Sequence, residues 1–170
     1  MSEELPSWGE LVSQLVGLVE SRLMDPLEIL LESGSDLARV RRRVVEKAGT
    51  WAHALLGEDE MLARQTAIRL VITLYSGEPG FDQAPGWWQT PFGRVMVRRV
   101  GHPMADSVSY AVAGAMLGIT RQGVHDLVVR GKLDRHEDGG VTTASVQRRI
   151  TSSVTRDTRP RARREEEAEK

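Results

Sequence analysis

The N-terminal part of the chain carries apolar residues at three- and four-residue steps, the spacing of amphipathic helices. Residues 7–24 form the first such stretch. Ser7 stands at its start as an N-cap, and Glu10, three residues later, completes a capping box. Asp25-Pro26 is expected to break this helix and to start a short second one, because proline is tolerated in the first turn of a helix.

Two longer helices are predicted over residues 36–56 and 58–76. Gly34-Ser35-Asp36 is expected to end the short helix and to cap the first of these two. The apolar residues of that helix form one seam close to a heptad pattern, made of Leu37, Val40, Val44, Ala48, Trp51 and Leu55. The helix over residues 58–76 is predicted to be the most buried of the set, because Ile68 and Ile72 widen its apolar face.

The composition changes at residues 77–86, where glycine and proline are frequent. Residues 77–90 are therefore predicted to be a linker between two domains. Trp87 and Trp88 are expected to anchor a core or a domain interface. Thr90 then caps a helix over residues 91–100, which proline begins.

The stretch 109–133 predicts two short helices joined by a tight turn. Gly118 ends the first helix, where a residue that accepts positive φ is favoured, and Thr120 caps the second, over residues 121–130. Ile119 is expected to point back into the pocket between the two helices. The apolar positions of the pair are Ala113, Leu117, Ile119, Val124 and Leu127.

From Gly131 onward the pattern changes from helical to alternating. Residues 132–136 and 140–142 are predicted to pair as a small β-hairpin around Asp138-Gly139-Gly140. Thr143 is expected to cap a last helix over residues 144–152.

These residues resemble the helix-turn-helix of bacterial DNA-binding proteins. The resemblance is carried by Ala113-Gly114, by Leu117-Gly118-Ile119 and by Thr120-Arg121-Gln122-Gly123-Val124. Together with the predicted hairpin, this helix-turn-helix is similar to the winged form found in MerR-like regulators and phage excisionases. The resemblance covers about residues 107–150, roughly a quarter of the chain. Gly114 departs from the pattern, which more often has alanine there. The resemblance implies that the second helix enters the major groove of double-stranded DNA.

The second helix carries the candidate base-reading residues. Arg121 can bond bidentately to guanine and Gln122 to adenine, and His125 lies one turn further along. Gly123 either lets a phosphate backbone approach the helix closely or is tolerated without a function. The alternative for the three polar residues is an ordinary solvent-exposed face.

Further DNA contacts are predicted around this helix. Ser109 and Thr120 can offer a hydroxyl and helix-start N–H groups to phosphates, or they act only as caps. Lys132 and Arg135 on the hairpin can meet phosphate or the minor groove. A last set, interpreted either as phosphate contacts or as a solvated face, comprises Arg94, Arg98 and Arg99.

Composition narrows the classes of function. The chain has 170 residues and a net charge of −1. It contains no cysteine, which excludes disulfides and thiolate metal sites. No apolar run approaches the ~20 residues that span a bilayer, so a cytoplasmic, nucleoid-associated protein with no membrane partner is expected. No phosphate-binding loop, nucleophile elbow or histidine pair at metal-ligand spacing is present. We therefore expect no enzyme, no cofactor and no metal site, and we interpret the basic group at residues 39–43 as a solvated face.

The sequence predicts a mainly α fold, in which an N-terminal helical bundle precedes a winged helix-turn-helix with a small β-hairpin wing. The predicted boundaries are an N-terminal domain over residues 1–76, a linker over 77–90, the winged domain over 91–155 and a charged disordered tail over 156–170.

The predicted function is sequence-specific binding of double-stranded DNA, as a bacterial transcriptional regulator. One small winged domain makes few contacts, so a homodimer through the N-terminal helices is expected. Two alternatives stay open. One is an excisionase-like architectural factor that bends DNA during recombination. The other is a protein-interaction adaptor with a vestigial helix-turn-helix, which the near-neutral charge favours.

Overall fold

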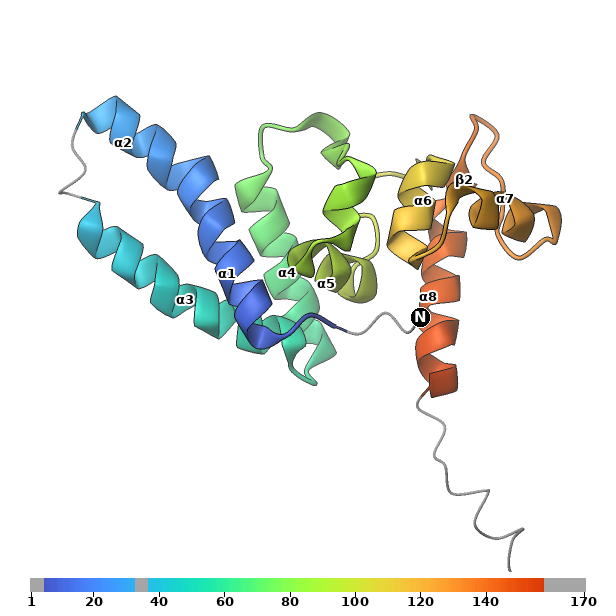
Figure 1. Cartoon of the computed structure of the whole chain (residues 1–170), viewed down its shortest axis with the longest axis horizontal. Helices are drawn as coiled ribbons and strands as arrows, with labels where there is room; N and C mark the ends of the chain where they lie inside the picture. Colours follow the sequence, from blue (N-terminus) through green and yellow to red (C-terminus); the bar gives the residue numbers. More distant parts are fainter. Residues whose placement is uncertain (1–4, 33–36, 158–170) are drawn as a thin grey trace, which may run out of the picture.

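The computed structural model describes residues 5–32 and 37–157 (Figure 1). Its helices are α1 (Trp8–Val19), α2 (Asp25–Leu31), α3 (Ala38–Leu56), α4 (Glu60–Leu74), α5 (Pro91–Arg99), α6 (Tyr110–Leu117), α7 (Arg121–Val129) and α8 (Thr143–Asp157). The shorter elements are a π-helical turn η1 (Glu20–Met24), two 3-10 turns η2 (Pro79–Phe81) and η3 (Pro85–Gln89), and the strands β1 (Ser107–Val108) and β2 (Val141–Thr142). The predicted mainly α fold is confirmed. None of the described helices is both long and apolar enough to cross a lipid bilayer.

The first helical arm runs from α1 through η1 into α2 without a break. The predicted capping box is present, since the Ser7 side chain accepts the Glu10 N–H and the Glu10 carboxylate accepts the Ser7 N–H at 2.9 Å. The predicted break at Asp25-Pro26 is wrong. Asp25 keeps helical φ and ψ, and its N–H bonds the Glu20 carbonyl five residues back. Pro26 lies in the first turn of α2 and needs no carbonyl partner, so the π-turn admits it without ending the helix.

The second arm, α3, packs along α1. The most deeply buried members of the predicted seam are Leu37, Ala48 and Leu55. Val40, by contrast, is 46% exposed. Arg41 does not belong to a solvated face, because it bridges the two arms through an ion pair of 3.0 Å to Glu20 and a second one to Glu28. The predicted helix end and cap at residues 34–36 lie outside the described residues.

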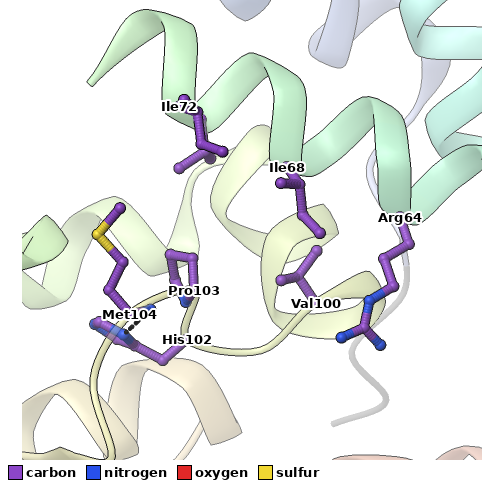
Figure 2. A pocket seen from close by; sticks show the side chains of 8 residues that line it. Arg64, Ile68, Ile72, Val100, His102, Pro103 and Met104 are labelled. Atoms are coloured by element: carbon purple, nitrogen blue, oxygen red, sulfur yellow. Dashed lines mark hydrogen bonds between the residues drawn. The ribbon is translucent and has the colours of Figure 1, made fainter. Parts of the chain in front are cut away.

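The helix α4 lies between α3 and α5 and leaves one side open. Its inner face is buried at Ala63, Thr66, Ala67, Leu70, Val71 and Leu74. The prediction that Ile72 widens this buried face is wrong, because Ile72 is 54% exposed. The open side borders a cavity that the segment after α5 closes from below (Figure 2).

Residues 77–90, predicted as a linker, pack as an aromatic layer. Phe81 and Trp88 are each 1% exposed, and their rings meet edge to face with centroids 5.8 Å apart. The expectation that a tryptophan anchors a core is thereby confirmed. Gly93 lets η3 lie directly on α5, since a Cβ there would be 2.1 Å from the Trp87 carbonyl oxygen. The division of the chain into separate domains stays a prediction.

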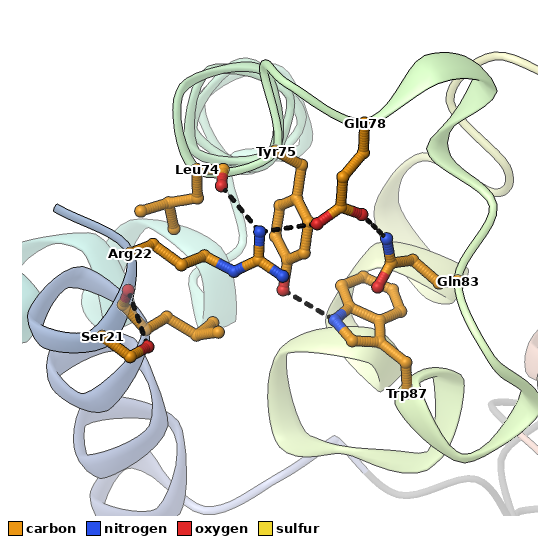
Figure 3. A network of polar contacts seen from close by, with 8 residues as sticks. Ser21, Arg22, Leu74, Tyr75, Glu78, Gln83 and Trp87 are labelled. Atoms are coloured by element: carbon orange, nitrogen blue, oxygen red, sulfur yellow. Dashed lines mark hydrogen bonds and ion pairs between the residues drawn. The ribbon is translucent and has the colours of Figure 1, made fainter. Parts of the chain in front are cut away.

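A polar network ties the first arm to this aromatic layer (Figure 3). Arg22, in η1, donates to the Leu74 carbonyl at 3.1 Å and to Glu78 at 2.7 Å. The Arg22 guanidinium lies 3.8 Å from the centroid of the Tyr75 ring, and the Tyr75 hydroxyl accepts the Trp87 indole N–H at 2.7 Å. The hydrogen bond from Arg22 holds the pKa of Glu78 below its usual value. The π-turn is therefore the part of the arm that is bonded to the aromatic layer.

The small sheet differs from the predicted hairpin. β2 pairs antiparallel with β1, which precedes α6 and was not predicted as a strand. The predicted pairing of residues 132–136 with 140–142 is also present: Arg135 forms an antiparallel bridge with Val141, the His136 N–H donates to the Gly140 carbonyl at 3.2 Å, and the Thr142 N–H donates to the Asp134 carbonyl at 2.9 Å. Gly140 packs against β1, where a Cβ would be 2.3 Å from the Val108 carbonyl oxygen. The turn of the hairpin is thus held by a strand more than 30 residues earlier in the chain.

The last helix, α8, starts and ends outside its predicted bounds. Thr142, rather than Thr143, acts as its cap, because the Thr142 hydroxyl accepts a backbone N–H of the first turn at 3.2 Å. Thr143 instead donates its hydroxyl to the Ala105 carbonyl at 2.9 Å and so ties α8 to the segment before β1. The helix continues to Asp157, and the predicted charged tail beyond that residue lies outside the described part of the chain.

Candidate functional site

At Gly114 the helix α6 lies directly against the turn that leads into α7. A Cβ at this position would lie 2.8 Å from the Ile119 carbonyl oxygen, so the alanine that is common in the pattern does not fit this backbone. The Gly114 carbonyl also accepts the Ile119 N–H at 2.9 Å. Gly118 between them has the left-handed conformation expected of it, with φ at 64°.

Ile119 does not point into the pocket between the helices, contrary to prediction. Its side chain is 38% exposed and lies over Gly123. The physical reason is the close approach at Gly114, which places the Ile119 carbonyl rather than its side chain against α6. The side chains that fill the interior here are Ala113, Met116 and Val124.

Both predicted caps are confirmed. The Ser109 hydroxyl accepts the Val112 N–H at 3.2 Å at the start of α6. The Thr120 hydroxyl accepts the Gly123 N–H at 3.1 Å at the start of α7. A phosphate contact by either residue stays a prediction.

The helix α7 presents its three candidate base-reading side chains to solvent. Arg121, Gln122 and His125 are all exposed, whereas Val124 on the opposite side is 0% exposed. The Gln122 amide donates to Asp126 at 3.1 Å, and His125 Nδ1 lies 3.8 Å from the same carboxylate. The structure therefore brings the three candidates to one face and adds an acidic neighbour, Asp126.

Basic side chains continue past the end of α7. Arg130 and Lys132 are exposed on either side of Gly131, and Arg135 is exposed at the bridge to β2. Sequence reasoning passed over Arg130, although its place at the end of the same helix was an available signal. Residues 107–153 hold six Arg and Lys against four Asp and Glu, so this part of the chain has a net charge of +2. This part of the chain therefore carries more positive than negative charge.

The arginines of α5 lie apart from this face. α5 packs against α1, α4 and η3, and α6 lies between α5 and α7 in Figure 1. Arg94 and Arg98 are partly buried on α5. The structure does not bring these two residues together with the exposed face of α7.

Arg99 is neither a solvated residue nor a phosphate contact. It is 8% exposed, and its Nε donates to the Leu55 carbonyl at 3.0 Å. Its guanidinium also donates to the Gly57 carbonyl at 2.8 Å and pairs with Glu60. Arg99 therefore closes the C-terminal end of α3, where carbonyl groups lack helical partners.

Exposed aliphatic side chains are frequent on α2 and in the first half of α3, and we call this set of residues the arm patch. Ile29 and Leu30 are 76% and 78% exposed. The other exposed aliphatic side chains of the patch are Leu27, Leu31, Val40 and Val45. Sequence reasoning expected broad apolar faces on the N-terminal helices but did not single out α2. The signal was the run Leu-Glu-Ile-Leu-Leu, which puts apolar residues on every side of a two-turn helix.

Comparison of the chain with known protein families, curated proteins and solved structures finds no match. Within the described residues, no three His, Asp or Glu side chains come together as a metal-binding group. The exposed face of α7 and the arm patch are the two surface features that bear on function.

Proposed function

We propose that this protein binds double-stranded DNA sequence-specifically, with α7 as the reading helix in the major groove. This proposal is supported by the difference between the two sides of α7, one exposed and one buried. Arg121, Gln122 and His125 are exposed on one side, and the fully buried Val124 fixes the helix on the other. Arg and Gln are the side chains that recognise guanine and adenine bidentately, and a rigid helix holds them at a fixed depth in the groove.

In the unbound protein, Asp126 is hydrogen-bonded to one of the side chains that we expect to read the bases. It accepts the Gln122 amide at 3.1 Å, so reading adenine requires Gln122 to exchange this bond for one to the base. Within the described chain no carboxylate lies within salt-bridge distance of Arg121. Arg121 is therefore available to a guanine without such an exchange. Lys132 and Arg135 are exposed beyond the end of α7, and we expect them to position the duplex through its phosphates.

The arm patch supports a homodimer as the binding form, as in a bacterial transcriptional regulator. Exposed aliphatic residues are concentrated on α2, which lies at the opposite end of the molecule from α7 in Figure 1. Pairing two copies through this patch would leave both reading helices free. Two reading helices would double the number of base contacts and would match a site of two half-sites.

The DNA-binding proposal is tested by fluorescence anisotropy with an arbitrary duplex of about 30 base pairs at several salt concentrations. A DNA-binding protein should bind at low salt, with an affinity that falls steeply as salt rises. Lys132→Ala should reduce the slope of log K against log salt by about one. Arg69→Ala, which removes an exposed arginine from α4, is the matched control and should leave the slope unchanged. An adaptor would show no binding even at low salt, which would refute the proposal.

The homodimer is tested by size-exclusion chromatography with light scattering on the full chain of 18.9 kDa. We expect twice this mass for the wild type and the monomer mass for Leu30→Glu. Because Leu30 is 78% exposed, the substitution leaves the fold intact. A wild-type protein that remains a monomer at micromolar concentration would rule out this part of the proposal.

A further inference from the structure

The cavity beside α4 has apolar walls and a single cationic end. Its volume is about 170 Å³. Its apolar wall residues are Ile68, Val71, Ile72, Val100, Pro103 and Met104. Figure 2 shows Arg64 at one end, beside Val100, and Met104 at the other end. The cavity is smaller than the ~300 Å³ at which drug-sized pockets begin, so it suits a molecule of roughly eight non-hydrogen atoms.

Arg64 is the group that selects the chemistry of a ligand. Within the described residues no carboxylate lies within salt-bridge distance of its guanidinium. In His102, the other polar side chain of the lining, Nδ1 accepts the Ala105 N–H at 2.9 Å, so this nitrogen does not donate to a ligand. An arginine without a carboxylate partner binds carboxylates through its planar fork of donors.

We propose that this cavity binds a small apolar monocarboxylate, with the carboxylate on Arg64 and the hydrocarbon along Ile68, Val100 and Met104. The lining has one cationic residue, Arg64, and six apolar residues. This composition favours a ligand with one negatively charged end and an apolar body. A neutral ligand of the same shape would offer the Arg64 guanidinium no negative charge to pair with. A dicarboxylate would place a second charge against the apolar end.

The wall of the cavity continues into the candidate DNA-binding region. Residues 101–106 run from α5 past the cavity into β1, and the Thr143 N–H bonds the Asp106 carbonyl at 2.9 Å. On its other side the His102 ring lies 5.2 Å from the Trp88 ring of η3, and η3 packs against α6. A ligand that moves Pro103 or Met104 therefore acts on the supports of α6. The consequence, a change in DNA affinity, rests on the proposed function, whereas the binding site itself does not.

The test is an NMR chemical-shift titration of the full chain with hexanoate, and with hexanamide as its neutral counterpart. We expect saturable shifts at residues 100–105 with a Kd on the order of 1 mM for hexanoate, which is typical of so small a ligand. Hexanamide should bind about fivefold to tenfold more weakly, because its amide gives the Arg64 guanidinium a neutral acceptor in place of a carboxylate. Arg64→Gln should weaken hexanoate binding by the same factor and leave hexanamide binding unchanged. Arg69→Gln, on the same helix but outside the lining, is the matched control and should bind hexanoate like the wild type.

Two results would overturn the site. One is the absence of saturable shifts at tens of millimolar hexanoate. The other is equal binding of hexanoate by the wild type and Arg64→Gln. Ile72→Glu gives a second check, because an acidic side chain at this half-exposed lining position should abolish hexanoate binding in a folded protein. If the protein bound hexanoate but no DNA duplex, the carboxylate site would stand and the proposed DNA-binding function would be refuted. Failure of the site and failure of the proposed function are therefore distinguishable.

Discussion

Replacing glycine by alanine at two positions of the α6–α7 unit should change the stability of the protein in opposite directions. Gly114 and Gly123 both lie within helices, where alanine is favoured over glycine by about 1 kcal/mol. At Gly123 the nearest neighbours of a new Cβ would be 3.5 Å away, which is ordinary contact. Gly123→Ala should therefore raise the free energy of unfolding by up to about 1 kcal/mol.

At Gly114 the same change meets the backbone of the turn. The new Cβ would lie 2.8 Å from the Ile119 carbonyl oxygen and 3.4 Å from the Thr120 carbonyl carbon. A backbone carbonyl cannot rotate away as a side chain can, so α7 must move outward. Overpacking of this kind costs about 1–3 kcal/mol, which exceeds the gain in helix propensity. Gly114→Ala should therefore lower the free energy of unfolding by about 1–2 kcal/mol.

Denaturant and thermal unfolding followed by far-ultraviolet circular dichroism measure both effects. In a chain of this length, 1 kcal/mol corresponds to a change in Tm of about 2–4 °C. Gly9→Ala is the control for helix propensity alone, because a Cβ there would meet nothing within 4 Å. If Gly114→Ala proved as stabilising as Gly123→Ala, the close approach of α6 and α7 would be refuted. In DNA-binding assays, Gly123→Ala should lose affinity while gaining stability if a phosphate backbone approaches this turn.

Three further predictions concern single side chains. Arg99→Met should lower the free energy of unfolding by about 2–3 kcal/mol in urea titrations, because two carbonyl groups lose a buried donor, whereas Arg98→Met should change it by less than about 0.5 kcal/mol. Burial lowers the pKa of His102, with Asp82 opposing the shift, so the folded state binds a proton less readily than the unfolded state. The free energy of unfolding should therefore be at its full value above pH ~6.5 and fall as the pH drops below it. In urea titrations, the free energy of unfolding of His102→Gln should depend less on pH than that of the wild type. An unchanged pH dependence would exclude His102 as its source. Ile119→Asp should remain folded in circular dichroism with a loss below about 1 kcal/mol, since this side chain is 38% exposed; loss of the fold would show that the side chain is buried after all.

Local signals in the sequence predicted most helix ends. Ser7, Thr90, Ser109 and Thr120 each accept a backbone N–H three residues ahead, as their side chains and positions suggested. Gly118 likewise adopts the left-handed conformation expected at a helix end. These features depend on a few neighbouring residues, so the sequence alone determines them.

Features that depend on distant residues were missed. The partner of β2 is β1, and nothing in the alternation of residues 140–142 indicates a strand before α6. The glycine-rich stretch at residues 77–86 suggests a linker, but Phe81 within it is buried by Trp88 and Tyr75. Among the candidate site residues, Arg121, Gln122 and His125 share a face because they share a helix. The placement of Arg94, Arg98 and Arg99 depended on tertiary packing and could not be predicted.

Selection of duplexes from a random library with the purified full chain tests whether α7 reads the sequence of double-stranded DNA. We expect enrichment of a motif of two half-sites, related by two-fold symmetry and separated by about 10 base pairs or a multiple of that distance. Arg121→Ala or Gln122→Ala should relax the preference at one position of each half-site and cost about 1–3 kcal/mol of specific affinity without lowering the Tm. Failure to enrich any sequence at low salt, or an identical motif from the wild type and both variants, would contradict the claim.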